Sequence, residues 1–488
     1  EYIFIYKYTN SKMFVFLIIF FIFFVNKIFS SYILFPFETE NLGTNIIQSK
    51  YDINLHTHLK VGLPNQKIKI YFRDDFFSFF ILNRDTIYND EETNETNIPS
   101  EFKKVDENNL YNNKISSTYK NISKYRNFFI DIYYRKGFLS SDIFYFNESN
   151  NLKRYDNIEF VLVNKIKPNR TLISGAIGLL VDEYNLEGAQ SFARMLVKKN
   201  VTSYCVWSKI YFKNNSGVFV FGDYPHVYFN DKFYEEQYVE TDIKLNVYKQ
   251  KWNLAFNEIF IKINYNNRYK DLYLNTTLYG ELRHNLGLII GTQEYHNLIF
   301  DVFFKYKLKE GICGKNEIFI NDFNDNKINY IYYYCNNIET FRKESFPKLF
   351  LKQKELNYIF ELDDKDLFIL QDEKWYFMII FEGEETSDQM HKWFFGEPLL
   401  KKYNFIFDPI NYKIGFYNPN IPILKKVGKN IREEKNNIFE QKRYLIILIL
   451  LIFISFLLFL HILIKQWNSN KIKRNSYTEL QNLTIQKD

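Results

Sequence analysis

The chain has 488 residues, which is long enough for two or three domains with cores of their own. Its 63 basic and 57 acidic residues leave a net charge of +6, which argues against a dedicated nucleic-acid binder with a dense basic face. Aromatic residues make up 19% of the chain, whereas only 17 glycines and 10 prolines are present, so collagen-like and low-complexity classes are excluded. No glycine-rich phosphate loop and no metal-ligand spacing of Cys or His occurs, so we expect neither a cofactor nor a metal.

The beginning of the chain carries a short apolar run. Residues 13–25 are apolar, follow Lys12 and precede the small pair Ser30 and Ser31. Thirteen residues are too few to span a bilayer comfortably, so this pattern indicates a secretory signal over 13–31, with 1–12 as an upstream extension. An uncleaved anchor is the alternative. The stretch 32–50 is then expected to be a short pro-like segment.

The end of the chain predicts a membrane anchor. Residues 444–464 are interrupted only by Ser455 and His461, and 21 residues of helix can cross a bilayer core of about 30 Å. We expect a polar stalk over 419–443, a transmembrane helix over 444–464 and a cytosolic tail over 465–488. The prediction is a single-pass type I membrane protein of the secretory pathway or the cell surface. Seven N-x-S/T triplets between the two apolar runs are candidate glycosylation sites: Asn94, Asn121, Asn147, Asn169, Asn200, Asn214 and Asn275.

The body between these segments is typical of an all-β protein. Short runs of β-branched and aromatic residues end in turn-forming stretches, for example at 67–72, 158–163, 217–221 and 375–381. The best short helix is predicted at 190–198. A body of this size is too large for one sandwich, so we expect two β lobes.

The three cysteines and the histidines predict little chemistry. Cys313 and Cys335 are close enough in sequence to close one disulfide loop, which leaves Cys205 as a buried thiol on a strand. His56 and His58 would share one face of a strand. No third ligand is spaced to join them, so we interpret them as solvated strand residues rather than a metal site.

Five segments of the body follow one another in an informative order. They are 51–70 (YDINLHTHLKVGLPNQKIKI), 137–142 (GFLSSD), 174–179 (SGAIGL), 216–223 (SGVFVFGD) and 393–416 (WFFGEPLLKKYNFIFDPINYKIGF). They resemble the first hairpin, the strand after the flap, the D-G-I-L-G-L segment, the strand closing the first lobe and the end of the fold in pepsin-like aspartic peptidases. This resemblance implies a bilobal pepsin-like fold, with an N-terminal lobe over 51–230 and a C-terminal lobe over 231–418.

The family's chemistry requires two aspartates, one on a D-T-G or D-S-G loop of each lobe, that share a proton across the cleft. Placed after the apolar strand 67–72, the first aspartate position falls on Arg73. Counted back from Gly287-Leu-Ile-Ile-Gly291, the second falls on Arg283. No D-T-G or D-S-G triplet occurs in the chain, and arginine cannot act as a general base. The resemblance therefore implies a protein without intact catalytic residues.

Two further observations bear on this interpretation. A shifted register would bring Asp74 or Asp75 into the first loop, but a slip of one residue turns a strand side chain to the other face. The expected flap is also short, because only Arg135 and Lys136 separate Tyr133 and Tyr134 from Gly137. The candidate cleft residues are Arg73, Asp74, Asp75, Arg283, Tyr133 and Tyr134.

Two accounts of the arginines remain open. In one, the cleft is a vestige in which Asp74 and Asp75 neutralise Arg73 while Glu281 neutralises Arg283. In the other, the two arginines form a binding site for a carboxylate or an acidic peptide. The function that we expect is that of an inactive peptidase homologue on a membrane, which binds a peptide or an acidic protein. The alternatives are an active aspartic endopeptidase with displaced catalytic residues and a cell-surface structural or adhesion protein.

Overall fold

The computed structural model divides the chain into two compact units, 1–421 and 422–488. Residues that it describes are 31–40, 45–74, 78–88, 109–124, 126–129, 134–148, 151–166, 173–181, 190–212, 216–243, 251–265, 268–274, 278–321, 327–339, 341–383, 392–422, 460, 461, 463–465 and 467. The expected signal at 13–31 lies outside these residues except for Ser31, and so does the expected transmembrane helix apart from 460, 461, 463 and 464. Within the described ranges, no helix combines the length and the apolarity that a membrane span needs.

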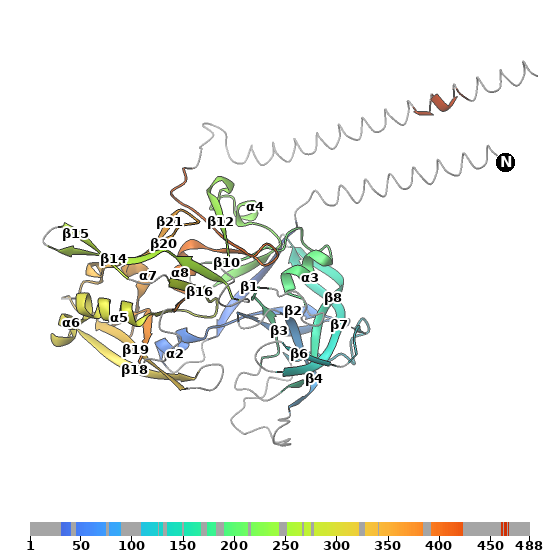
Figure 1. Ribbon diagram of the computed structural model, residues 1–488. Coiled ribbons are helices and arrows are strands. Elements are labelled where there is room, and N and C mark those ends of the chain that lie inside the picture. Colours follow the sequence, from blue (N-terminus) through green and yellow to red (C-terminus); the bar gives the residue numbers. More distant parts are fainter. Residues whose placement is uncertain are drawn as a thin grey trace, which may run out of the picture. The chain divides into compact units, whose positions relative to one another are not determined.

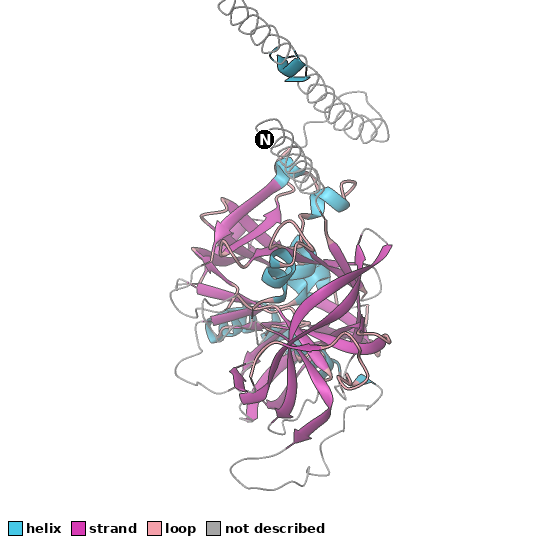
Figure 2. Ribbon diagram, turned by 90° about the vertical axis from the view of Figure 1, so that its right-hand side faces the viewer, coloured by secondary structure: helices cyan, strands magenta, loops and turns pink. Residues whose placement is uncertain are grey.

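The first unit is built mainly from β-strands, which confirms the all-β prediction in its coarse form (Figures 1 and 2). One sheet runs in the order β12 (Tyr238–Asp242), β27 (Lys413–Tyr417), β26 (Ile406–Asp408), β10 (Trp207–Tyr211), β11 (Gly217–Phe221), β1 (Ile33–Glu40), β2 (Asn54–Val61), β3 (Gln66–Arg73), β9 (Gly175–Gly178), β4 (Phe79–Tyr88), β8 (Asn151–Ile166), β7 (Tyr134–Glu148) and β5 (Lys120–Asn121), and β6 (Arg126–Phe129) pairs with β7.

A second sheet runs in the order β13 (Asn253–Phe256), β16 (Leu278–Leu282), β25 (Lys392–Phe395), β17 (Ile289–Gly291), β24 (Ile379–Glu382), β19 (Lys327–Asn336), β23 (Lys374–Phe377) and β22 (Phe368–Gln371), and β18 (Cys313–Asn321) pairs with β19. A third contains β15 (Arg268–Tyr273), β14 (Glu258–Tyr265), β20 (Lys348–Gln353) and β21 (Tyr358–Leu362).

One strand arrangement occurs in both halves of this unit. In the first half, β9 lies between β3, to which it is parallel, and β4, to which it is antiparallel. In the second half, β25 lies between β16, again parallel, and β17, again antiparallel. The two arrangements also agree in the next strand of the sheet, because β4 is parallel to β8 in the first half and β17 is parallel to β24 in the second. The chain segments after β3 and after β16 therefore occupy equivalent positions in the two halves.

The helices are short, and most of them follow strands. They are α2 (Ile46–Tyr51), α3 (Phe192–Lys198), α4 (Pro225–Tyr228), α5 (Gln293–Ile299), the π-helix η3 (Phe300–Phe304), α6 (Lys305–Lys309), α7 (Asp364–Leu367) and α8 (Glu397–Tyr403), with 3-10 turns η2 (Glu235–Gln237) and η4 (Lys343–Ser345). The helix expected at 190–198 is α3, which starts two residues later because the Ser191 side chain caps it by accepting from the Arg194 N–H. Residues 32–50, expected as a pro-like segment, contribute β1 and α2 to the first unit.

Aromatic side chains hold much of the core together. Phe72 on β3 is fully buried and stacks on Phe219 of β11 at 4.1 Å between ring centroids. Trp207 on β10 stacks on Phe407 of β26 at 4.4 Å. Burial of one such side chain contributes roughly 2 to 3 kcal/mol, so these contacts fix the ends of β3 and β10 beneath the segments that carry the candidate site.

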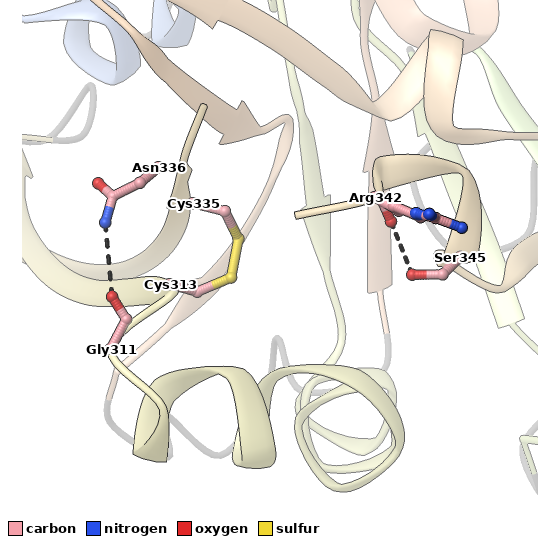
Figure 3. The surroundings of a disulfide bond; sticks show 6 residues. All are labelled: Gly311, Cys313, Cys335, Asn336, Arg342 and Ser345. Atoms are coloured by element: carbon pink, nitrogen blue, oxygen red, sulfur yellow. Dashed lines mark hydrogen bonds between the residues drawn. A yellow bond between two sulfur atoms is a disulfide. The ribbon is translucent and has the colours of Figure 1, made fainter. Parts of the chain in front are cut away.

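A disulfide joins two neighbouring strands, as predicted (Figure 3). Cys313 on β18 and Cys335 on β19 face each other in the ladder and are bonded. The Asn336 amide donates to the carbonyl of Gly311 at 3.4 Å beside this bond. Cys205 takes no part in this disulfide and is buried, as predicted, but it lies in the bend before β10 and not on a strand.

Candidate functional site

The first loop begins with Arg73 at the end of β3. Its residue exposure is only 5%, and its Nη1 lies 3.2 Å from Asp52 Oδ1 and 3.3 Å from Asn54 Oδ1. The Arg73 carbonyl accepts from the N–H of Leu179, so strand β9 also fixes the backbone. Asp52 therefore neutralises a guanidinium that is almost completely buried.

The second loop, residues 283–288, connects β16 to β17 and begins with Arg283. The Arg283 N–H donates to the carbonyl of Phe395, which ties the loop to β25. Its Nε donates to Glu281 Oε1 at 2.9 Å, and its guanidinium carbon lies 4.0 Å from the ring centre of Phe394. The side chain of Arg283 is 23% exposed, so it is less enclosed than that of Arg73.

Glu281 is the acidic centre of a small charged cluster. Its side chain is 3% exposed and faces Arg283, Lys251 at 3.7 Å and Lys392 at 2.5 Å. Burial alone would raise the pKa of Glu281, but the three cations outweigh burial and lower it to about 2. The same carboxylate raises the pKa of Arg283 against the effect of burial, with a further contribution from Asp74.

Asp74 and Asn285 join the two loops directly. The Asp74 N–H donates to Asn285 Oδ1 at 3.2 Å, and the Asn285 N–H donates to Asp74 Oδ2 at 3.2 Å. The Asn285 amide nitrogen also donates to the carbonyls of Ile53 and Phe72, each at 2.9 Å. Both residues are buried. The amide of Asn285 thus holds three backbone groups of the opposite half in place.

A chain segment from α2 to β2 lies against both loops. Lys50 accepts from the Gly287 N–H through its carbonyl at 2.7 Å, and the Ile53 N–H donates to the carbonyl of Asn285 at 2.7 Å. A Cβ at Gly287 would lie 2.5 Å from Ile53 Cδ1, so a larger residue here would force the Ile53 side chain to move. Ile46 and Ile47 bury their side chains in a cluster with apolar residues of the second half, which are Leu286, Leu288, Ile290, Ile320, Tyr330, Met378, Ile380 and Phe394.

Lys209 of β10 and His284 of the second loop form a buried polar pair. Lys209 Nζ donates to the carbonyl of His284 at 3.2 Å and lies 4.4 Å from the centre of the Tyr211 ring. Burial lowers the pKa of Lys209 to about 8. Among the described residues, neither of the buried ring nitrogens of His284 has a hydrogen-bond partner, and burial followed by the charge of Lys209 lowers the pKa of His284 well below its usual value. His284 is therefore neutral in the folded protein at neutral pH.

The other predicted site residues fall in different places. Asp75 and Tyr133 lie outside the described residues, and Tyr134 is the first residue of β7. His56 and His58 do share one face, with ring centroids 5.9 Å apart, but only His58 is exposed, so the prediction of solvated side chains is wrong for the buried His56. The described part of the chain contains no group of three or more potential metal ligands. Asn121, Asn147 and Asn200 are exposed, whereas the remaining four candidate glycosylation sites are not described.

Three residues of the site were missed by the sequence analysis, and two of them have no signal in local sequence patterns. Asp52 reaches Arg73 from the end of α2, Asn285 bridges to the other half, and Lys209 comes from β10, which lies far from both loops in sequence. Only the identity of Asn285, at the glycine position of the expected D-T-G-like triplet, distinguishes one of them in the sequence.

The chemical capacity of this arrangement follows from its charges. In the contact between the two loops, the first loop contributes the carboxylate of Asp74. The second loop contributes none, because residues 283–291 contain no acid. Arginine stays protonated, so neither Arg73 nor Arg283 can take a proton from water. The arrangement can fix the two halves to each other and attract anions. A scan with protein-family models and a search of curated protein sequences each find no match to the chain.

Proposed function

We propose that this chain is a catalytically inactive, bilobal pepsin-like protein that works by binding a peptide or protein rather than by hydrolysis. In this proposal the chain is anchored by a single transmembrane helix over 444–464. The strand arrangement that occurs in both halves supports the bilobal part of the proposal, because each copy presents one loop at an equivalent position.

The observation that carries the proposal is the presence of arginine at both equivalent positions. Arg73 is held by Asp52 and Asn54, and Arg283 is held by Glu281. An aspartic peptidase activates water with one carboxylate and protonates the scissile carbonyl with the other. Two permanently protonated guanidinium groups supply neither a base nor a proton of suitable acidity.

The contact between Asp74 and Asn285 is a second support. Asp74 Oδ2 accepts a hydrogen bond from the Asn285 backbone, so this carboxylate helps to fix the loops to each other. The residue across from it is an amide and not an acid, so a proton-sharing pair of carboxylates cannot form between these two positions.

Peptide hydrolysis tests the proposal. The purified chain is incubated with a denatured protein substrate at pH values from about 2 to 7, and fragments are detected by mass spectrometry. We expect no fragments above the level of a heat-inactivated sample. Acid-dependent cleavage that is inhibited by pepstatin, and that is lost in Asp74→Asn or Asp75→Asn, would support the active endopeptidase instead.

A further inference from the structure

Aromatic side chains gather around the short helix α4. The surface formed by these rings and one aliphatic side chain is named the α4 face, and its residues are Tyr204, Phe212, Tyr224, Val227, Tyr228 and Phe229. Tyr224 at the start of the helix contacts Tyr204, with ring centres 5.9 Å apart. At the end of the helix, Phe229 contacts Tyr228 at 5.0 Å and Phe212 at 6.3 Å. The rings before and after the helix pack on the same buried cluster, so they form one surface.

Part of the α4 face is open to solvent. The exposed fraction is 50% for Tyr204, 39% for Phe212 and 44% for Val227. One exposed apolar residue needs no explanation, but three on one group of rings indicate an interaction surface. The ammonium group of Lys232 lies 6.0 Å from the ring centres of both Phe212 and Phe229. Aromatic rings with polar groups at their margin are typical of surfaces that meet lipid headgroups.

The described part of the first unit begins and ends beside this face. Near its beginning, the ring of Tyr32 lies 5.0 Å from that of Tyr228. At its end, the carbonyl of Ile421 accepts from Gln237 Nε2 at 3.0 Å. Strand β12 starts at the next residue after Gln237, and its first ring lies 5.2 Å from that of Tyr224, so β12 runs beside α4 (Figure 1).

Both ends continue in the sequence toward apolar runs. Residues 26–31, six in number, lead back to the run 13–25, and residues 422–443, 22 in number, lead on to the run 444–464. Six residues can span at most about 20 Å when they are fully extended. An anchor at either end of the chain is therefore connected to the α4 face by the shortest path along the backbone.

The charges at the margin of the face do not favour one kind of headgroup. Glu235 and Glu236 are exposed beside the exposed Lys232, so both signs of charge are present. The apolar rings, rather than attraction to anionic lipid, are then the basis for a contact with a bilayer.

We infer that the α4 face docks on the bilayer that anchors the chain, with Tyr204, Phe212 and Val227 at the level of the lipid headgroups. This inference rests on the membrane anchor of the proposed function and adds a second contact with the same membrane. A body that is docked in this way does not turn freely on its stalk. Its two loops are then presented to a ligand in a fixed orientation.

The test places a polarity-sensitive nitrobenzoxadiazole label on the α4 face of the full-length chain. Labelled Val227→Cys is reconstituted into phosphatidylcholine liposomes with and without doxyl-labelled lipid, which quenches fluorophores that touch it. Leu370→Cys is the matched control, because Leu370 is 47% exposed on β22 of the second sheet. Wild type treated with the label gives the background from the buried Cys205. Phe212→Cys is a second label position and decides if Val227→Cys does not fold.

At Val227→Cys and Phe212→Cys, we expect a shift of the emission to shorter wavelength and a loss of fluorescence with doxyl lipid. Neither effect should occur at Leu370→Cys. Both effects should persist at high salt, since screening weakens charge contacts but not the burial of apolar rings.

Three outcomes would overturn the inference. One is equal emission and equal quenching at the α4 face and at Leu370→Cys. Another is an emission shift without quenching, which would mean that protein rather than lipid covers the face. The third is complete removal of the chain from the liposomes by alkaline carbonate, which would also refute the membrane anchor of the proposed function. A chain that resists carbonate while its α4 label stays in water would refute only the inference.

Discussion

Asn285 offers the most direct perturbation of the contact between the two loops. Its side chain accepts from the Asp74 N–H and donates to the carbonyls of Ile53 and Phe72. Asn285→Ala removes these three hydrogen bonds and leaves three buried backbone groups without that partner. At about 1 kcal/mol for each bond, we expect the free energy of unfolding to fall by about 3 kcal/mol.

Asn285→Asp separates the hydrogen bonds from the shape of the side chain. A carboxylate at this position would face the carbonyl oxygens of Ile53 and Phe72 and would lie beside Asp74. At neutral pH this variant should therefore lose more stability than Asn285→Ala, although it is closer in shape to the wild type.

Urea unfolding followed by tryptophan fluorescence measures these changes. Trp207 and Trp252 are buried, and Trp252 donates to the carbonyl of Leu179 next to the first loop, so both report on this region. Asn316→Ala is the control, since Asn316 is exposed and makes a long hydrogen bond of 3.4 Å to the Tyr332 hydroxyl. A loss below about 0.5 kcal/mol in Asn285→Ala, equal to that of the control, would refute the reasoning.

Three further predictions concern charge and covalent structure. The pKa of Glu281 is about 2, below its unfolded value, so its contribution is present above about pH 4.5 and is lost as the pH falls toward 2. Acid titration of stability should therefore show up to about 3 kcal/mol of loss in this range that is missing in Glu281→Gln. The pKa of His284 is lowered in the folded protein, so below about pH 6.5 the unfolded chain takes up a proton that the folded chain does not, and the fold loses stability. As the pH falls from 7 to 5, the free energy of unfolding of His284→Phe should therefore rise by about 2 kcal/mol relative to that of the wild type. The double variant Cys313→Ser, Cys335→Ser opens a loop with a sequence separation of 22 and should cost about 3 kcal/mol in urea unfolding.

Specific results would contradict each of these. If the free energy of unfolding of the wild type and of Glu281→Gln falls equally as the pH is lowered, the Glu281 carboxylate is not stabilised by its cations. A stability difference between the wild type and His284→Phe that does not change with pH would show that the imidazole is not kept neutral by burial. An unchanged unfolding midpoint on loss of both cysteines would show that the loop between them is already constrained.

The strands could be predicted well because their signals are local. The run 217–221 is β11 without any shift, and 67–72 lies within β3, since alternating or continuous apolar residues end at polar turns in both. The run 375–381 was expected as one strand but is divided between β23 and β24, because Tyr376 pairs with β19 while Ile379 pairs with β17. Pairing with different neighbours cannot be read from one apolar run.

The helical stretch α5–η3–α6 was missed for a physical reason. Residues 293–309 are rich in aromatic and β-branched side chains, which favour strands, but the Thr292 side chain caps the helix and buried residues recur four apart at Tyr295, Ile299 and Phe303. The cap and this spacing were the available signals. Tertiary burial of that stripe then outweighs its weak helix propensity.

The candidate site was predictable only in part. Arg73 and Arg283 could be placed from the apolar strands that precede or follow them. The partners that decide their chemistry could not, because Asp52, Asn285 and Lys209 reach the loops through contacts between distant parts of the chain. Asp74 was expected to neutralise Arg73, and in the structure it exchanges hydrogen bonds with Asn285, which is 211 residues away.

Incorporation of oxygen from labelled water tests the central claim most directly, because an acid pair that activates water exchanges oxygen into the carboxyl terminus of a short peptide even without net cleavage. The chain is incubated with such a peptide in H₂¹⁸O between about pH 3 and 7, and the peptide mass is measured. With guanidinium groups at both loop positions, we expect no ¹⁸O uptake above that of the peptide alone. Uptake that Asp74→Asn abolishes would contradict the account.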